Sequence, residues 1–215
     1  MNSLDLEGLK KALNNAADCI LAEIQTLTQA DQAIGDGDHG IGMERGWTAV
    51  KAALAAGGTE TIPATLETVG KTLMLKVGGS SGAIFGTLFI AGSKAVPEGP
   101  LDAALTSALT AEGFARFLEA GLEGVQKRGS AKVGDKTLVD ALAPAAAEAR
   151  LKCNNGESLG ACLKAAAQAA EDGMEKTRDM VATLGRAKTL GERARGHRDP
   201  GAISMALMLR GLAGT

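Results

Sequence analysis

The chain has 215 residues, 45% of them hydrophobic and 22% charged, which suits one globular domain with a sizeable core. Its 23 Lys and Arg against 25 Asp and Glu leave a net charge of −2 without any basic block, so nucleic acid is not an expected partner. The N-terminus lacks a basic region followed by an apolar run, and the longest apolar stretch, AIFGTLFIAG, is too short for a bilayer. We therefore expect a cytoplasmic protein that does not use a membrane.

The first half of the chain shows four helical patterns. Apolar residues recur at three- and four-residue spacing from Leu9 to Leu27, which predicts an amphipathic helix, and the stretch from Met43 to Leu54 predicts a second. A third helix is expected to begin at Pro63, since proline suits a first helical turn, and to stop at the pair Gly78-Gly79. The segment AIFGTLFIAGSKA follows as the fourth.

The second half adds four more helices. They are marked by Phe114 to Val125, by Leu138 with the alanine-rich segment after it, by about residues 157–183, and by Pro200 with the apolar run that follows. Tyrosine is absent, aromatic residues make up 2%, and no run alternates β-branched residues as a strand would. The sequence therefore predicts an all-α fold in which about eight antiparallel helices form a single domain over residues 1–215.

The loops of such a bundle alternate between its two ends, because short connections join antiparallel neighbours. One end is expected to gather DQAIGDGDHG, VGGSSG, RGSAKVGDKT and LGRAKTLGERARGHRDPG, which hold both histidines, a cluster of aspartates and most of the loop arginines. Each of these loops leads into a helix N-terminus, where unpaired N–H groups and the helix dipole favour anions. The pattern predicts a site for a polyanion such as a nucleotide diphosphate.

The loop DQAIGDGDHG places three aspartates within eight positions. Carboxylates roughly 5 Å apart repel by about 3 kcal/mol per pair at an effective dielectric near 20, so they either separate in water, as in a solvated turn, or share a cation. The glycines match the dinucleotide fingerprint, but a helix and not a strand precedes them, and no Glu closes an EF-hand frame from Asp36. A small ion held partly by substrate phosphates, as Mg²⁺ is, fits the pattern best.

Two other loops have both a structural and a functional interpretation. The segment GGSSG, residues 78–82, is either a helix stop followed by an N-cap or a nest that binds phosphate. Arg186 is a surface charge or a phosphate ligand, and His197 with Asp199 is a capped turn or part of the same site. Carboxylates, a Gly-Ser nest, cations and helix N-termini together are what phosphoryl transfer requires, which favours the functional interpretation.

Four segments, DQAIGDGDHG, VGGSSGAIFGTLF, RGSAKVGDKTLVD and GERARGHRDPGA, resemble in order the ADP-binding L subunit, or C-terminal nucleotide domain, of the dihydroxyacetone kinase family. The resemblance implies a closed barrel of eight antiparallel helices with the nucleotide, ADP or ATP, and two Mg²⁺ at one end. It implies Mg²⁺ ligation by Asp31, Asp36 and Asp38. It implies nucleotide contacts from His39, Gly40, Ile41, Gly42, Ser80, Ser81, Gly129, Leu138, Arg186, Asp199, Pro200 and Gly201, with Leu138 in the place of a family Met.

The same resemblance implies an activity that needs a second protein. The L subunit passes a phosphoryl group to dihydroxyacetone, which a separate K subunit holds covalently. The phosphoryl source is either exchanging ATP or bound ADP recharged by a phosphoprotein of the sugar phosphotransferase system, and a free-standing L chain favours the second. Two alternatives stay open, namely a non-catalytic Mg-nucleotide sensor that docks on a regulator and a kinase subunit for another small ketose such as erythrulose.

The acceptor site is expected on the partner. Both histidines, His39 and His197, lie in loops assigned to the nucleotide end, so neither is free to anchor a carbonyl. A very small polar acceptor must be held in line with the phosphoryl group, and the sequence offers no pocket for it. The nucleotide end should therefore dock on the K subunit, with Arg193, Arg195 and Arg198 meeting acidic partner surface or phosphate.

Overall fold

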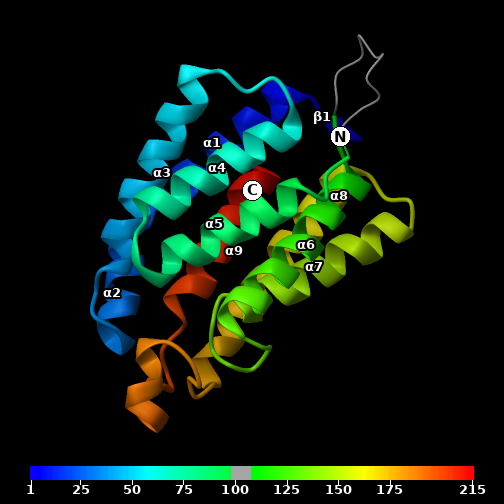
Figure 1. Ribbon diagram of the computed structural model, residues 1–215. Coiled ribbons are helices and arrows are strands. Elements are labelled where there is room, and N and C mark those ends of the chain that lie inside the picture. Colours follow the sequence, from blue (N-terminus) through cyan, green and yellow to red (C-terminus); the bar gives the residue numbers. More distant parts are fainter. Residues whose placement is uncertain (98–107) are drawn as a thin grey trace.

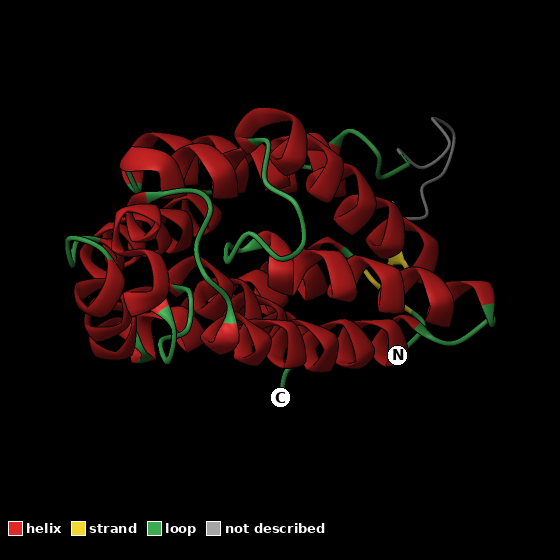
Figure 2. Cartoon of the chain, turned by 90° about the horizontal axis from the view of Figure 1, so that it is seen from below, coloured by secondary structure: helices red, strands yellow, loops and turns green. Residues whose placement is uncertain are grey.

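The computed structural model describes residues 1–97 and 108–215, which form nine α-helices, two 3-10 segments and one pair of two-residue strands (Figure 1). In chain order these are β1 Ser3–Leu4, α1 Leu6–Ala22, α2 Ile24–Ile34, α3 His39–Ala56, α4 Ile62–Lys76, α5 Gly79–Ser93, β2 Leu109–Thr110, α6 Ala111–Gly129, α7 Val139–Asn154, α8 Leu159–Lys176, η1 Thr177–Asp179, η2 Arg186–Ala194 and α9 Pro200–Ala213. The predicted all-α class is confirmed, and Figure 2 shows how little of the chain is strand. None of these helices is both long and apolar enough to cross a membrane.

Eight of the helices close into a ring. Each helix contacts the next in the order α3, α4, α5, α6, α7, α8, α9, α1, and α1 returns to α3, while α2 packs on α3 and α9. The core inside the ring is continuous from α1 to α9, and its largest buried side chains include Trp47, Phe85 and Phe89. Phe89 contacts the rings of Trp47 and Phe117 edge-on, at centroid distances of 6.2 and 5.4 Å. The expected closed barrel is therefore observed.

Two predicted helix boundaries are wrong. The single helix expected from Leu9 to Leu27 is two helices, α1 and α2, separated at Glu23, which has φ −112° and ψ 19°. Both helices turn an apolar face to the same core, so a hydrophobic stripe does not reveal a one-residue interruption between them. The helix expected to reach residue 183 ends at Lys176, because Thr177 turns its hydroxyl onto the carbonyl of Met174 at 2.6 Å and accepts the N–H of Asp199 at 2.9 Å.

Two further elements were not expected from the sequence. The strands β1 and β2 pair Ser3 with Thr110 and Leu4 with Leu109, and two residues are too few to show an alternating pattern. The segment η2 lies in what was expected to be a plain loop, and its helical character is interrupted at Gly191, with φ 55°. Both depend on contacts with distant segments, which local periodicity does not report.

The helices that begin away from the loop cluster are capped by side chains. The N-caps of α1, α4, α6 and α8 are Asp5, Thr61, Thr110 and Ser158, and each accepts the N–H three residues further on. Such caps satisfy N–H groups that have no intrahelical acceptor. At the other end, Asp199 caps α9 in the same way, whereas the N-cap residues of α3, α5 and α7 make no such bond.

Candidate nucleotide site

The four loops that lead into α3, α5, α7 and α9 meet at one end of the ring, at the lower end of Figure 1. They line one pocket with a volume of about 280 Å³. Twelve of the residues predicted for the site line it, namely Asp31, Asp36, Asp38, His39, Ser80, Ser81, Gly129, Leu138, Arg186, Asp199, Pro200 and Gly201. The structure thus brings together residues from the four separate segments that the sequence pointed to.

Gly40, Ile41 and Gly42 do not line this pocket. A Cβ on Gly40 would lie 2.7 Å from the carbonyl oxygen of Ile24, and one on Gly42 would lie 2.9 Å from that of Val77. The side chain of Ile41 is exposed. The two glycines therefore let the first turn of α3 approach α2 and the end of α4 closely, which fixes where that turn presents its N–H groups.

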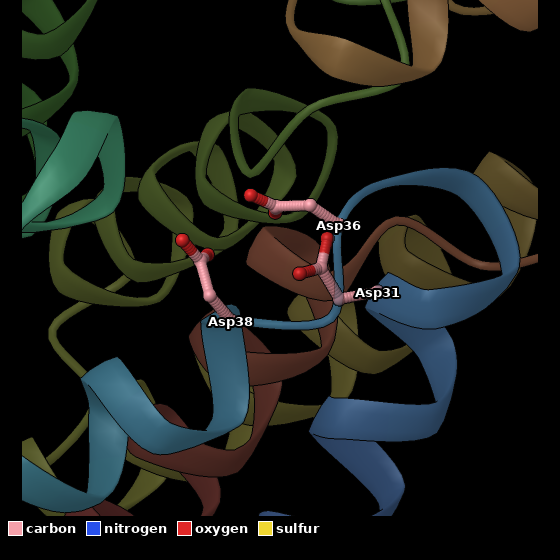
Figure 3. Close-up of side chains that lie close together, drawn as sticks. All are labelled: Asp31, Asp36 and Asp38. Carbon is pink, nitrogen blue, oxygen red and sulfur yellow. The ribbon is translucent and has the colours of Figure 1, made fainter.

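Three aspartates of the α2–α3 turn converge on one point. Asp31, in the last turn of α2, is largely buried and accepts the N–H of His39 at 3.1 Å. Asp36 and Asp38 follow in a turn that requires Gly37 at φ +81°. One carboxylate oxygen from each of the three aspartates lies within 4.8 Å of the others (Figure 3). A solvated turn would not require this convergence, whereas three hard oxygen ligands around one point fit a divalent cation.

Arg186 lies beside this carboxylate group. It forms an ion pair with Asp36, and its Nη2 is 3.9 Å from Oδ2 of Asp38. Arg186 belongs to η2, 150 positions along the chain from Asp36. The guanidinium offsets the repulsion between carboxylates and places a fixed positive charge at the mouth of the pocket.

The start of α3 is tied to α5 and α9 through His39. Its Nδ1 is 3.0 Å from the hydroxyl of Ser81, and its Nε2 is 2.8 Å from that of Ser204. Burial lowers the pKa of His39, and the nearby Asp31 opposes that shift only in part, so the ring is neutral at pH 7. Sequence reasoning missed Ser204. Its one signal is a lone hydroxyl in the apolar run AISMALMLRGL, where it is fully buried.

Three helices begin at the pocket without a side-chain cap. The N-cap residues of α3, α5 and α7 are Asp38, Gly78 and Leu138, and none of their side chains makes a capping bond. Gly78 and Gly79, both with positive φ, turn the chain so that α5 starts with Ser80 and Ser81 at the pocket wall. The N–H of His39 at the start of α3 is taken by Asp31, and that of Val139 at the start of α7 by the hydroxyl of Thr137. The N–H donors left for an anion are therefore those of the next residues of α3 and those at the start of α5, where the positive end of the helix dipole also lies.

The remaining pocket wall is apolar. Ile34, Ile84, Phe85, Val125, Ala131, Leu184 and Ala187 line it together with Leu138. A pocket lined by carboxylates, helix N-termini and apolar side chains offers partners for both parts of a nucleotide, its phosphates and its base. Sequence reasoning identified the polar side and, among the apolar residues, only Leu138.

Lys136, which is buried, and Asp199, which is half-buried, both line the pocket. Asp199 caps α9 by accepting the N–H of Ala202 at 2.8 Å, and burial raises its pKa to about 7 although Lys136 acts in the opposite direction. Lys136 is 1% exposed, and its ammonium donates to the carbonyl oxygens of Thr177 and His197, each at 2.5 Å. Sequence reasoning assigned Lys136 no role, because nothing in the neighbouring residues distinguishes this lysine from a solvated one.

Of the three arginines expected to meet a partner, two form ion pairs within the chain. Nε of Arg195 is 3.0 Å from Glu192, and Nη1 of Arg198 is 2.9 Å from Glu175. Arg193 is exposed. Exposed pairs of this kind contribute only about 0–1 kcal/mol, so exchange for partner contacts costs little, and the docking role stays a prediction.

Comparison with known proteins agrees with this site. The DAK2 domain matches residues 33–214. The PEP-dependent dihydroxyacetone kinase 1, ADP-binding subunit DhaL, of Listeria innocua is 41% identical over 207 residues, which cover 94% of this chain and 93% of the relative. The corresponding Escherichia coli subunit is 38% identical over 201 residues, covering 94% and 92%.

A solved structure shares the fold. The dihydroxyacetone kinase from C. freundii, in complex with AMP-PNP and Mg²⁺, superposes with a TM-score of 0.73 at 23% identity. The match covers all of this chain and 34% of that longer one. The chain therefore belongs to the DAK2 domain family, and the family resemblance predicted from its four loop segments is confirmed.

Proposed function

We propose that this chain is the nucleotide-binding subunit of a dihydroxyacetone kinase, a phosphotransferase whose acceptor is held by a partner K subunit. The observation that supports this best is a single pocket in which three converging carboxylates and uncapped helix N-termini face an apolar wall. The kinship with ADP-binding subunits named for this reaction, along nearly their whole length, points the same way.

The pocket suggests a division of roles among its residues. Asp31, Asp36 and Asp38 would hold Mg²⁺, two ions in our proposal, and the bound metal would neutralise phosphate charge. Phosphate oxygens would take N–H groups from the first turns of α3, at Gly40 and Ile41, and of α5, with hydroxyls from Ser80 and Ser81. The N–H of Gly42 donates to the carbonyl of Asp38, so Gly42 would contribute through its backbone position. The base would lie against the apolar wall, with Gly129, Leu138, Pro200 and Gly201 around it. Arg186 and Asp199 complete the rim.

These residues act by position and charge. His39, held from both ring nitrogens, fixes the hydroxyl of Ser81, and the left-handed Gly78 and Gly79 fix the backbone before it. Groups already in place need no reorganisation when charge shifts between phosphate oxygens, which is where such catalysis gains most. Segment 184–187 covers one side of the pocket and limits the access of water.

We further propose that the chain keeps ADP bound and is recharged in place by a phosphoprotein of the sugar phosphotransferase system. The two relatives described above are PEP-dependent by name, and this chain covers more than nine-tenths of each. A nucleotide that stays bound suits a pocket to which η2 contributes Arg186 and Ala187. The cytoplasmic location stays a prediction.

A coupled assay tests the division of labour. The purified chain with Mg-ATP and dihydroxyacetone should show no turnover, because both ring nitrogens of His39 already face serine hydroxyls and the acceptor site is proposed to lie on the K subunit. Turnover should appear when a K subunit is added, and with a charged phosphotransferase-system donor in place of ATP. Steady turnover by the chain alone would contradict the proposal. Erythrulose as a second acceptor tests the ketose, and Mg-ADP binding without transfer under any condition would favour the sensor.

A further inference from the structure

The segment between α8 and α9, residues 177–199, lies at the lower end of Figure 1, and we call it the strap. Near its middle, Leu184 to Ala187 line the pocket and Arg186 pairs with Asp36. Its small apolar residues, Ala182, Ala187 and Ala194, pack with Ile34 in a cluster separate from the main core. Besides this small cluster, Thr183 bonds Asp135 of the α6–α7 loop through its N–H and its hydroxyl. Few buried contacts hold the rest of the strap, so the position of Arg186 depends also on how the two ends are fixed.

The two ends of the strap lie side by side. The N–H of Gly196 donates to the carbonyl of Arg178 at 2.8 Å, and Nε of Arg178 donates back to the carbonyl of Gly196 at 3.1 Å. Lys136, from the α6–α7 loop, adds a charged group that reaches both ends, since its ammonium bonds the carbonyls of Thr177 and His197. The side chain thus ties three stretches of chain together at one point.

Lys136 is held in an unfavourable state. Its charge is almost fully buried, and its backbone lies in the left-handed region at φ +60°. Asp140 fixes the turn on both sides by accepting the N–H of Gly134 at 2.5 Å and that of Thr137 at 2.8 Å. Strained backbone and buried charge persist only where the surrounding structure enforces them, and they gather at functional sites.

We propose that Lys136 is a positioning residue that fixes the base of the strap and thereby holds Arg186 beside the carboxylates. Lys136 is among the residues that line the pocket, but the two hydrogen bonds of its ammonium go to the strap. The consequence for nucleotide retention rests on the proposed function, whereas the consequence for the strap itself does not. The two are therefore measured separately.

The first experiment is limited trypsin digestion of the ligand-free chain. Cleavage after Arg186, Lys188 and Arg193 requires the strap to open, and its rate follows the population of the open form. Lys136→Met should raise that rate about tenfold, since bonds donated by a charged group are lost. Lys132→Met, at an exposed lysine of the same loop, is the matched control and should leave the rate unchanged. Equal rates in both variants would overturn the proposal.

Two further variants separate the ammonium from other effects. Lys136→Gly removes the amine and also relieves the left-handed strain, so it should open the strap as Lys136→Met does. A normal cleavage rate in the glycine variant would assign the effect to strain and overturn the proposal. If Lys136→Met fails to fold, judged by circular dichroism, Arg178→Ala loosens the same base from an exposed position. An unchanged cleavage rate in Arg178→Ala would also contradict the proposal.

The second experiment measures release of Mg-ADP by stopped flow. Lys136→Met should speed release about tenfold, and adding it to Arg186→Ala should change little, because both act through the same guanidinium. Purely structural weakening would instead add to the effect of Arg186→Ala, and this additivity would overturn the positioning role. If the unaltered chain binds no Mg-ADP, the proposed function fails while the trypsin result still decides the strap.

Discussion

At the scale of single residues, the site is marked by polar side chains that are buried, where a folded core is usually apolar. Among the described residues, the buried polar side chains other than Thr65 and Ser93 all lie around the pocket or at the base of the strap. They are Asp31, His39, Lys136, Asp140, Thr177 and Ser204. Each has a hydrogen-bond partner, as buried polar groups require, and most of those partners come from another element. The pocket is therefore pre-arranged by a connected network.

The aspartates can be separated by their partners. Asp38→Asn should abolish Mg-ADP binding in calorimetric titration and raise the unfolding free energy of the ligand-free chain by up to about 1 kcal/mol, because repulsion between carboxylates falls. Asp36→Asn should abolish binding as well but bring no gain, since it gives up the pair with Arg186. Unchanged affinity in both variants would remove the metal assignment.

Asp199 gives a pH dependence of known sign. Its pKa is about 7 in the folded chain against about 3.9 for a free Asp, so the folded state binds the proton more tightly. The stability it contributes is complete below pH 4 and is lost as the pH rises through 7. Asp199→Asn keeps an N-cap and removes the titration. Urea melts should show the variant gaining about 1–3 kcal/mol over the parent between pH 4 and 8. A difference in unfolding free energy between variant and parent that does not change with pH would refute the raised pKa of Asp199.

At the scale of elements, the sequence predicted which face of each helix is buried better than it predicted where each helix begins and ends. Apolar periodicity located the ring helices, because each buries one stripe in a common core. It did not place the break at Glu23 or the stop at Lys176, which are set by backbone and hydroxyl bonds of single residues. The segment η2 has no apolar stripe of its own and is held by contacts with α2.

Helix packing depends on glycine at close crossings. Gly211 of α9 lies against α1, where an added Cβ would meet the backbone of Ala16 and would lie 2.7 Å from the carbonyl oxygen of Asn15. Gly211→Ala should therefore cost about 1–3 kcal/mol, or more if the backbone cannot shift. Gly160→Ala, where the nearest atom is 3.6 Å away, is the control and should gain about 0.5–1 kcal/mol from helix propensity. Thermal melts of both variants measure the difference, and equal melting temperatures would contradict the crossing argument.

At the scale of the whole molecule, antiparallel alternation is what made the site predictable. Four loops far apart in the sequence had to share an end, so their polar residues were expected to meet before any contact was known. The alternation of loops between the two ends does not predict which side chains of different helices form hydrogen bonds with one another. The bond between His39 and Ser204 spans 165 positions, and Lys136 acquires its partners only because its backbone turns left-handed.

The assembled pocket should couple ligand to stability. Mg-ADP at 100 times its dissociation constant adds about 2.7 kcal/mol to the unfolding free energy, which for a domain of this size is about 5–10 °C in melting temperature. EDTA should remove most of the gain, because the phosphates then face three unneutralised carboxylates. A shift that EDTA leaves intact would mean that the nucleotide binds without the aspartates.

Trp47 gives the molecule an optical property of its own. It is the only tryptophan in a chain without tyrosine, so ultraviolet emission comes from one indole. That ring is fully buried beside Phe89, and its N–H has no hydrogen-bond partner among the described residues, which places the emission toward the blue. Helix α3 carries Trp47 and begins at His39 in the pocket. A shift in the emission wavelength when ligand is added would therefore report a change in that helix directly, without any attached dye.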